Sequence, residues 1–267
     1  MLFRSPGGHS LVQDADYVAA ATAASVVREG GVGAFDQIEL EKKLAGKVVG
    51  VSPSIGTLQE GISGSASPED LQTMFELIYA YFTAPRADST AFQALKKRIA
   101  GSIQNRNARP ETAFGDTIQV TMSSYHHRAR PWSMELLDEM DLEKSMQIYR
   151  ARFADAGDFT FTFVGNFTVE QIEPLVCAYL ATLPAAGREE TWRDIDMHGP
   201  EDVVEKLVYA GIEPKSTSRI VFSGPFEFDG WENNFAIDAM AAVLQIKLRE
   251  VLREDLGGTY GVGVSAS

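Results

Sequence analysis

Two stretches of the chain, more than 200 residues apart, share one layout: a helix end, a glycine stop and a strand start. Residues 41–52 read EKKLAGKVVGVS, and residues 249–265 read REVLREDLGGTYGVGVS. Leu44 corresponds to Leu256 with an offset of 212 positions, and Gly50 to Gly263 with an offset of 213. An offset this long predicts a duplicated domain rather than a short solenoid repeat. We therefore expect the chain to be a fragment of a longer protein that ends partway through its second copy.

The pattern of helices and strands predicts an α+β fold with an antiparallel or mixed sheet covered by several helices. We expect one complete domain at 1–183, a linker at 184–200, and the truncated start of a second domain at 201–267. Residues 48–55 and 58–65 are typical of an antiparallel strand pair, whereas 5–10 is typical of a loop. In the second domain we expect two strands, at about 203–210 and 218–224, before a long helix at about 230–254.

The composition indicates a water-exposed globular protein and excludes some partners. The formal net charge of −13 would repel phosphate backbones, so we expect no nucleic-acid partner. The longest apolar runs are too short to span a bilayer, so no membrane span is expected. Cys177 is the single cysteine, and its helical surroundings predict a small buried side chain rather than a disulfide.

Three stretches resemble the pitrilysin/insulinase family of zinc metallopeptidases, the inverzincins with an H-x-x-E-H motif. They are 141–153, the strand and turn DFTFTFVGNF at 158–167, and 252–263. The likeness is to large bacterial members that hold four similar peptidase-type α+β domains in one polypeptide. On this resemblance, 1–183 is the third domain and 201–267 begins the fourth.

The resemblance places zinc in the first domain of the longer protein and predicts no metal or cofactor in this chain. In that family two His bind zinc and the intervening Glu activates a water. No histidine here has the Glu-His partner that the motif requires; the four are His9, His126, His127 and His198. The helix that would match the metal helix presents Ala21, Ala24 and Ser25 instead. Because Arg128 and Arg130 flank the adjacent pair His126-His127, a solvated loop is the simpler interpretation.

The same resemblance assigns an auxiliary catalytic role to Arg253 and Tyr260. In the family's fourth domain an Arg and a Tyr, seven residues apart, reach toward the substrate at the zinc. Arg253 and Tyr260 match that spacing, whereas Lys42 and Val48 lie nearby in the first copy. A Tyr hydroxyl can donate to the oxyanion of a tetrahedral intermediate, and an Arg can hold the peptide backbone. The alternative is structural: a helix-end Arg favoured by the helix dipole and an aromatic residue that starts a strand.

These features predict a non-catalytic C-terminal half of a zinc endopeptidase, inactive by itself, that forms part of the substrate chamber. Its expected partners are the N-terminal catalytic half of the same polypeptide and a peptide or unfolded polypeptide substrate. By resemblance to bacterial relatives, the expected location is the periplasm. The alternative is a scaffold or partner subunit that binds peptides or another protein. An H-x-x-E-H motif in the same polypeptide or an adjacent gene would favour the enzyme.

Overall fold

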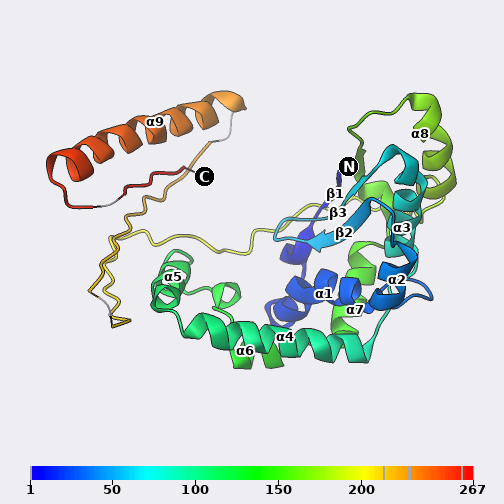
Figure 1. Ribbon diagram of the computed structural model, residues 1–267, viewed down its shortest axis with the longest axis horizontal. Coiled ribbons are helices and arrows are strands. Elements are labelled where there is room, and N and C mark those ends of the chain that lie inside the picture. The colour runs from blue at the N-terminus through cyan, green and yellow to red at the C-terminus, as the bar shows by residue number, and fades with distance from the viewer. Residues whose placement is uncertain (1, 213, 228–229, 260, 267) are drawn as a thin grey trace. The chain divides into compact units, whose positions relative to one another are not determined.

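The computed structural model describes residues 2–212, 214–227, 230–259 and 261–266 (Figure 1). The chain divides into two compact units, Met1–Lys215 (unit 1) and Ser216–Ser267 (unit 2). Within the described residues no helix is long and apolar enough to cross a membrane. The elements of unit 1 are, in chain order, β1 Leu2–Pro6, α1 Tyr17–Gly30, α2 Gln37–Lys43, β2 Val49–Ile55, β3 Gln59–Ala66, α3 Leu71–Thr83, α4 Ser89–Asn107, α5 Pro110–Thr121, α6 Met134–Asp138, α7 Leu142–Arg152, β4 Thr160–Thr162 and α8 Val169–Leu175.

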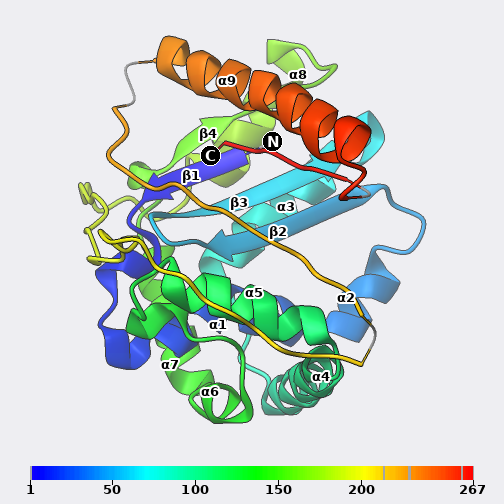
Figure 2. The same ribbon diagram turned by 90° about the vertical axis from the view of Figure 1, so that its left-hand side faces the viewer.

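The sheet of unit 1 has four antiparallel strands in the order β2-β3-β1-β4, which Figure 2 shows side by side. Phe3 of β1 lies opposite Ile62 of β3 and Phe161 of β4. Phe3 and Ile62 are fully buried, whereas the neighbouring Leu2 and Arg4 are exposed. Because side chains alternate along a strand, one face of the sheet therefore packs on the core and the other face stays open. This confirms the α+β class and the antiparallel pairing of residues 48–55 with 58–65.

Aromatic side chains fill much of the core beneath that face. The rings of Phe3 and Phe161 lie 4.8 Å apart, and Phe75 of α3 stacks on Phe163 at 5.6 Å. Tyr149 of α7 is fully buried and its hydroxyl donates to the carbonyl of Tyr81 at 3.2 Å. The hydroxyl thus keeps a hydrogen-bond partner while the ring contributes apolar area to the core.

Helix starts follow their capping residues. The Ser67 hydroxyl accepts from the Asp70 N–H at 3.2 Å and caps the 3₁₀ turn Pro68–Asp70, which leads into α3. Asp36 and Glu39 form a reciprocal capping box at the start of α2. Because these contacts satisfy N–H groups that have no partner inside the helix, they fix where each helix begins.

The expected linker at 184–200 has no helix or strand and runs along unit 1. The Arg188 N–H donates to Asp155 Oδ2 at 2.7 Å, and the Arg193 N–H donates to Ser10 Oγ at 3.0 Å. Arg152 holds Glu190 through two hydrogen bonds of 2.6 and 3.1 Å. The segment is therefore fastened to unit 1, and the compact unit continues beyond it to Lys215.

Unit 2 contains one long helix, α9 Trp231–Arg249, which continues as a π-helical segment, Glu250–Asp255. It confirms the long helix expected at about 230–254. The strands expected at 203–210 and 218–224 are wrong, because both segments are extended without ladder partners among the described residues. Short runs of β-branched and aromatic residues favour a strand, but a strand also needs a neighbour for its N–H and C=O groups.

Two smaller expectations are also corrected. Residues 5 and 6, expected in a loop, complete β1, because they pair with Glu60 and Gln59 of β3. Cys177, expected to be buried, is exposed. Cys177 lies in the segment Val176–Leu180, which continues α8. Ile172 and Leu180 face the core from this helix, and Val176 is partly buried. Cys177 is one residue past that stripe, and a helix turns each residue by about 100°.

Candidate functional site

Arg253 lies in the last turn of the long helix of unit 2. The helix ends in wider, π-type turns, in which the Leu256 N–H donates to the Val251 carbonyl at 3.1 Å. Gly258 closes the end by donating to the Leu252 carbonyl at 2.9 Å, and Gly257 has a φ of 59°. Arg253 is exposed and makes no ion pair with any described residue. Its guanidinium is therefore presented to solvent at the point where the chain leaves the helix.

Tyr260, the expected partner of Arg253, lies outside the described residues. Of its neighbours, Thr259 donates its hydroxyl to the Gly261 carbonyl at 2.9 Å. The Gly261 N–H donates back to Thr259 Oγ1 at 3.3 Å. The structure therefore gives no distance between Arg253 and Tyr260, and their joint role stays a prediction.

Gln245 fixes the segment that follows Tyr260, and the sequence reasoning did not single it out. Its Nε2 donates to the Val262 carbonyl, and its Oε1 accepts from the Val264 N–H at 2.5 Å. The side-chain amide thereby pairs with the extended backbone much as a neighbouring strand would. A signal was present in the sequence, because Gln245 interrupts the apolar run Val243-Leu244 and Ile246.

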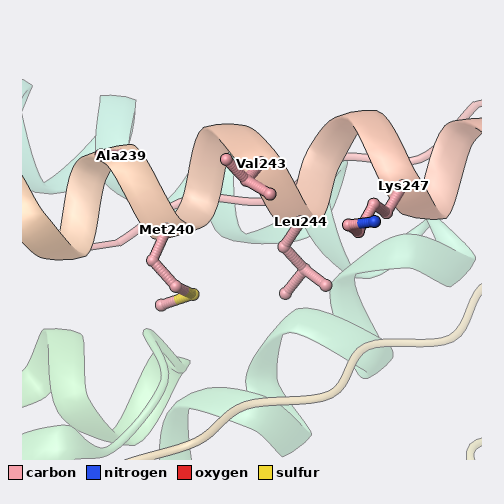
Figure 3. Close-up of a pocket in the computed structure, with 5 residues that line it drawn as sticks. All are labelled: Ala239, Met240, Val243, Leu244 and Lys247. Atoms are coloured by element: carbon pink, nitrogen blue, oxygen red, sulfur yellow. The ribbon is translucent and has the colours of Figure 1, made fainter.

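The same helix carries an apolar face. Figure 3 shows Met240, Val243 and Leu244 on successive turns of α9, with Lys247 one turn further. Met240 and Val243 are each 53% exposed, and Leu244 is 37% exposed. Adjacent apolar side chains left this open usually mark an interaction surface. Ala241 is the only side chain of α9 that is buried among the described residues.

The helix α1 does not supply a zinc site of the H-x-x-E-H kind. Its positions Ala21, Ala24 and Ser25 offer neither imidazole nor carboxylate, and its buried Thr22 hydroxyl donates to the Val18 carbonyl at 2.7 Å. Across the described part of the chain, no three His, Cys, Asp or Glu side chains gather in a way that could hold a metal ion. The residues therefore do not fit the metal that the resemblance assigns to another domain.

Two buried titratable side chains lie near the start of unit 1, and sequence reasoning assigned a role to neither. His9 is 8% exposed, and its buried Nδ1 makes no hydrogen bond to a described residue. Burial, and secondarily the charge of Arg128, lowers the pKa of His9 from 6.5 to about 4. His9 also packs edge-on against the ring of Tyr17 at 5.1 Å. It is therefore a neutral, packed imidazole at physiological pH, with no partner of the kind a catalytic base requires.

Glu60 is 1% exposed and accepts a hydrogen bond from the Gly8 N–H at 2.6 Å. Burial raises the pKa of Glu60 to about 7, although the Gly8 hydrogen bond and the charge of Arg152 oppose that rise. Arg152 lies 3.8 Å from Glu60 but only 2.6 Å from Glu190. Because Arg152 is shared between two carboxylates, this cluster ties β3, α7 and the 184–200 segment together, which is a structural role.

Arg128 organises the loop that carries His9. Its side chain is 1% exposed, and it donates to the carbonyls of His9 at 2.8 Å and Val12 at 2.6 Å. It also forms a 2.7 Å ion pair with Asp14. Arg128, which follows the His126-His127 pair in the sequence, is therefore a buried anchor. Only the tertiary structure shows this.

Comparison with known proteins shows what the chain is similar to. Residues 141–267 match the family described as "Peptidase M16 inactive domain". The "Probable zinc protease PqqL" of Haemophilus influenzae is 21% identical over 261 residues, which cover 96% of this chain and 27% of that protein.

Solved structures agree on the fold. The periplasmic protease PqqL from Escherichia coli aligns with a TM-score of 0.77 and 19% identity, over 98% of this chain and 29% of that one. A peptidase M16 inactive domain from Pseudomonas fluorescens aligns with a TM-score of 0.54 and 15% identity, over 72% of this chain and 48% of that one. This chain thus spans less than a third of the length of either PqqL protein.

The fold defines the class: an α+β domain of the peptidase type. Residues 141–267 are similar to the peptidase M16 inactive-domain family, and this match confirms the resemblance to the pitrilysin/insulinase metallopeptidases.

Proposed function

We propose that this chain is the non-catalytic C-terminal half of a zinc endopeptidase, forming part of its substrate chamber and assisting its chemistry through Arg253 and Tyr260. The match of residues 141–267 to the inactive domain of a peptidase family carries the proposal. The similarity over 96% of this chain to 27% of a zinc protease supports it, because the remaining length of that relative leaves room for a catalytic half.

The proposed chemistry is divided between the two halves. Water activation belongs to the catalytic half of the longer protein, and this chain stabilises the charge that develops on the substrate. The Tyr260 hydroxyl would donate to the oxyanion of the tetrahedral intermediate, and the exposed guanidinium of Arg253 would hold the peptide backbone. Gln245 is the positioning residue, since its amide anchors Val262 and Val264 just after Tyr260.

The proposed location is the periplasm, because the Escherichia coli relative is described as a periplasmic protease. The proposed partners are the catalytic half of the same polypeptide and a peptide or unfolded polypeptide substrate. Alone, the chain should neither bind stoichiometric zinc nor cleave peptides. Stoichiometric zinc in the purified chain, removed by a chelator together with a peptidase activity, would contradict the proposal.

Peptide hydrolysis by the full-length protein, wild type against Tyr260→Phe, tests the catalytic part. Loss of one oxyanion donor should lower kcat by roughly 10²–10³. Arg253→Ala should also impair hydrolysis, whereas Arg249→Ala, one turn earlier and paired with Glu254 at 3.7 Å, is the matched control. An active wild type with an unaffected Tyr260→Phe variant would leave this chain as chamber wall. Inactive full-length protein in the presence of zinc would favour the scaffold alternative.

A further inference from the structure

Helix α4 and the two residues after it carry bases without acids, against the acidic balance of the whole chain. Residues 89–110 contain five Lys or Arg and no Asp or Glu, although the whole chain has 37 acidic residues against 24 basic ones. The bases are Lys96, Lys97, Arg98, Arg106 and Arg109. A concentration of one charge against the sign of the whole protein creates a local field that a ligand of opposite charge can find.

Four of these cations line a groove of about 490 Å³ along α4. This helix lies along the lower edge of unit 1 in Figure 1. Lys97 and Arg109 belong to one row of side chains four residues apart, and Arg98 and Arg106 to the next. Ser102 and Asn105 lie between them and add neutral hydrogen-bonding groups. Gly101 leaves the middle of the groove open, since a Cβ there would meet nothing within 4 Å.

Two of the four cations are paired with carboxylates, and the other two are not. Arg98 is paired with Glu29 at 2.7 Å, and Arg106 holds Asp116 through two hydrogen bonds of 2.6 and 3.1 Å. Lys97 and Arg109 are exposed and form no ion pair with any described residue. The groove therefore retains a net positive charge at both of its ends.

The dimensions suit an extended peptide. Ten of the twelve positions from Lys97 to Arg109 lie in α4, which at 1.5 Å per residue is about 15 Å of helix before it ends at Asn107. An extended chain rises about 3.3 Å per residue, so roughly five residues cover that length. Carboxylates at the two ends of such a segment would meet Lys97 and Arg109, while Ser102 and Asn105 face its backbone.

We propose that the α4 groove binds an acidic, extended segment of the polypeptide that the longer protein degrades. This proposal rests on the proposed function, because it takes the bound segment to be part of the substrate. It adds that this part of the substrate is acidic and extended. A nucleic acid is the less suitable occupant, because the overall charge of −13 repels a continuous phosphate backbone but can accept a few local carboxylates.

The test is fluorescence anisotropy of a labelled eight-residue Glu-rich peptide with the 267-residue chain at low ionic strength. The variant Lys97→Glu/Arg109→Glu should raise the Kd at least tenfold, and 0.5 M NaCl should weaken wild-type binding in the same direction. The control Lys42→Glu/Lys43→Glu makes the same change of net charge at two exposed lysines of α2 and should alter the Kd less than twofold. Circular dichroism checks that both variants keep the wild-type helix content.

Three results would overturn the proposal: equal loss of binding in both double variants, equal affinity for a peptide with Gln in place of Glu, or tighter binding of a single-stranded oligonucleotide than of the acidic peptide. The first would show a general charge effect, the second a groove that does not read charge, and the third a different ligand class. Because no cleavage is measured, failure here is separate from failure of the Tyr260→Phe assay.

Discussion

The buried pair His9 and Glu60 predicts opposite pH dependences of stability that nearly cancel in the wild type. The pKa of Glu60 rises on folding from 4.5 to about 7. Between those values the folded protein keeps a proton that the unfolded chain has lost, so the free energy of unfolding falls as pH rises. The stabilisation is fully present below pH 4.5 and lost above pH 7. At 1.36 kcal/mol per pKa unit, the fall is about 3 kcal/mol.

His9 acts in the other direction over nearly the same range. Its pKa falls on folding from 6.5 to about 4. Between those values the unfolded chain binds a proton that the folded protein excludes, so the free energy of unfolding rises with pH. This rise is also about 3 kcal/mol, and it is complete above pH 6.5. From pH 4.5 to 6.5 the two contributions therefore oppose each other.

Replacing either residue should expose the contribution of the other. Relative to the wild type, Glu60→Gln should become more stable with rising pH by about 3 kcal/mol between pH 4.5 and 7. His9→Gln should become less stable by a similar amount between pH 4 and 6.5. Using differences from the wild type cancels the titration of the exposed carboxylates, which all three proteins share.

The assay is urea unfolding at pH 4.5, 5.5, 6.5 and 7.5 at constant ionic strength, followed by circular dichroism and analysed by linear extrapolation. The double variant Glu60→Gln/His9→Gln serves as the control, because its difference from the wild type should change little with pH between 4.5 and 6.5. Parallel curves for the wild type and Glu60→Gln would refute the reasoning, since they would mean that the Glu60 pKa does not change on folding.

Two further substitutions test how unit 1 is held together. Arg128→Met should lower the free energy of unfolding by about 3 kcal/mol in urea titrations, because it removes two charge-assisted hydrogen bonds and the Asp14 ion pair of a buried side chain, whereas Arg130→Met, at a partly exposed ion pair, should cost about 1 kcal/mol or less. Gly31→Ala should cost about 2 kcal/mol or more, because Gly31 has a φ of 87° and a Cβ would lie 2.2 Å from the Phe35 carbonyl oxygen; Gly33→Ala, also at positive φ but in open space, should cost less. Equal losses within either pair would contradict these assignments.

Local chemistry explains why much of the fold was predictable from the sequence. Residues 67–70 set the start of α3 through a capping hydroxyl and a proline, and both signals act within four residues. The strand pair β2–β3 was predictable because a short turn joins two neighbouring segments. Such interactions form between residues close in sequence, so a pattern is enough to locate them.

Long-range pairing was not predictable in the same way. Residues 5 and 6 join β1 because Gln59 and Glu60, more than 50 positions later, offer them a partner. Residues 203–210 and 218–224 have a strand pattern but no such partner among the described residues. Strand formation depends on hydrogen bonds to another segment, and the composition of one segment cannot supply them.

The candidate site shows the same division. The sequence by itself determined which side chains each segment carries: Arg253 with Tyr260 seven residues later, no His or Glu at positions 21, 24 and 25, and five bases without an acid at 89–110. Tertiary structure alone decided what surrounds those residues: Gln245 anchors the segment after Tyr260, Arg128 is buried, and burial moves the pKa values of His9 and Glu60 in opposite directions. The physical reason is that side-chain type is local, whereas desolvation and hydrogen-bond partners depend on residues brought together from distant parts of the chain.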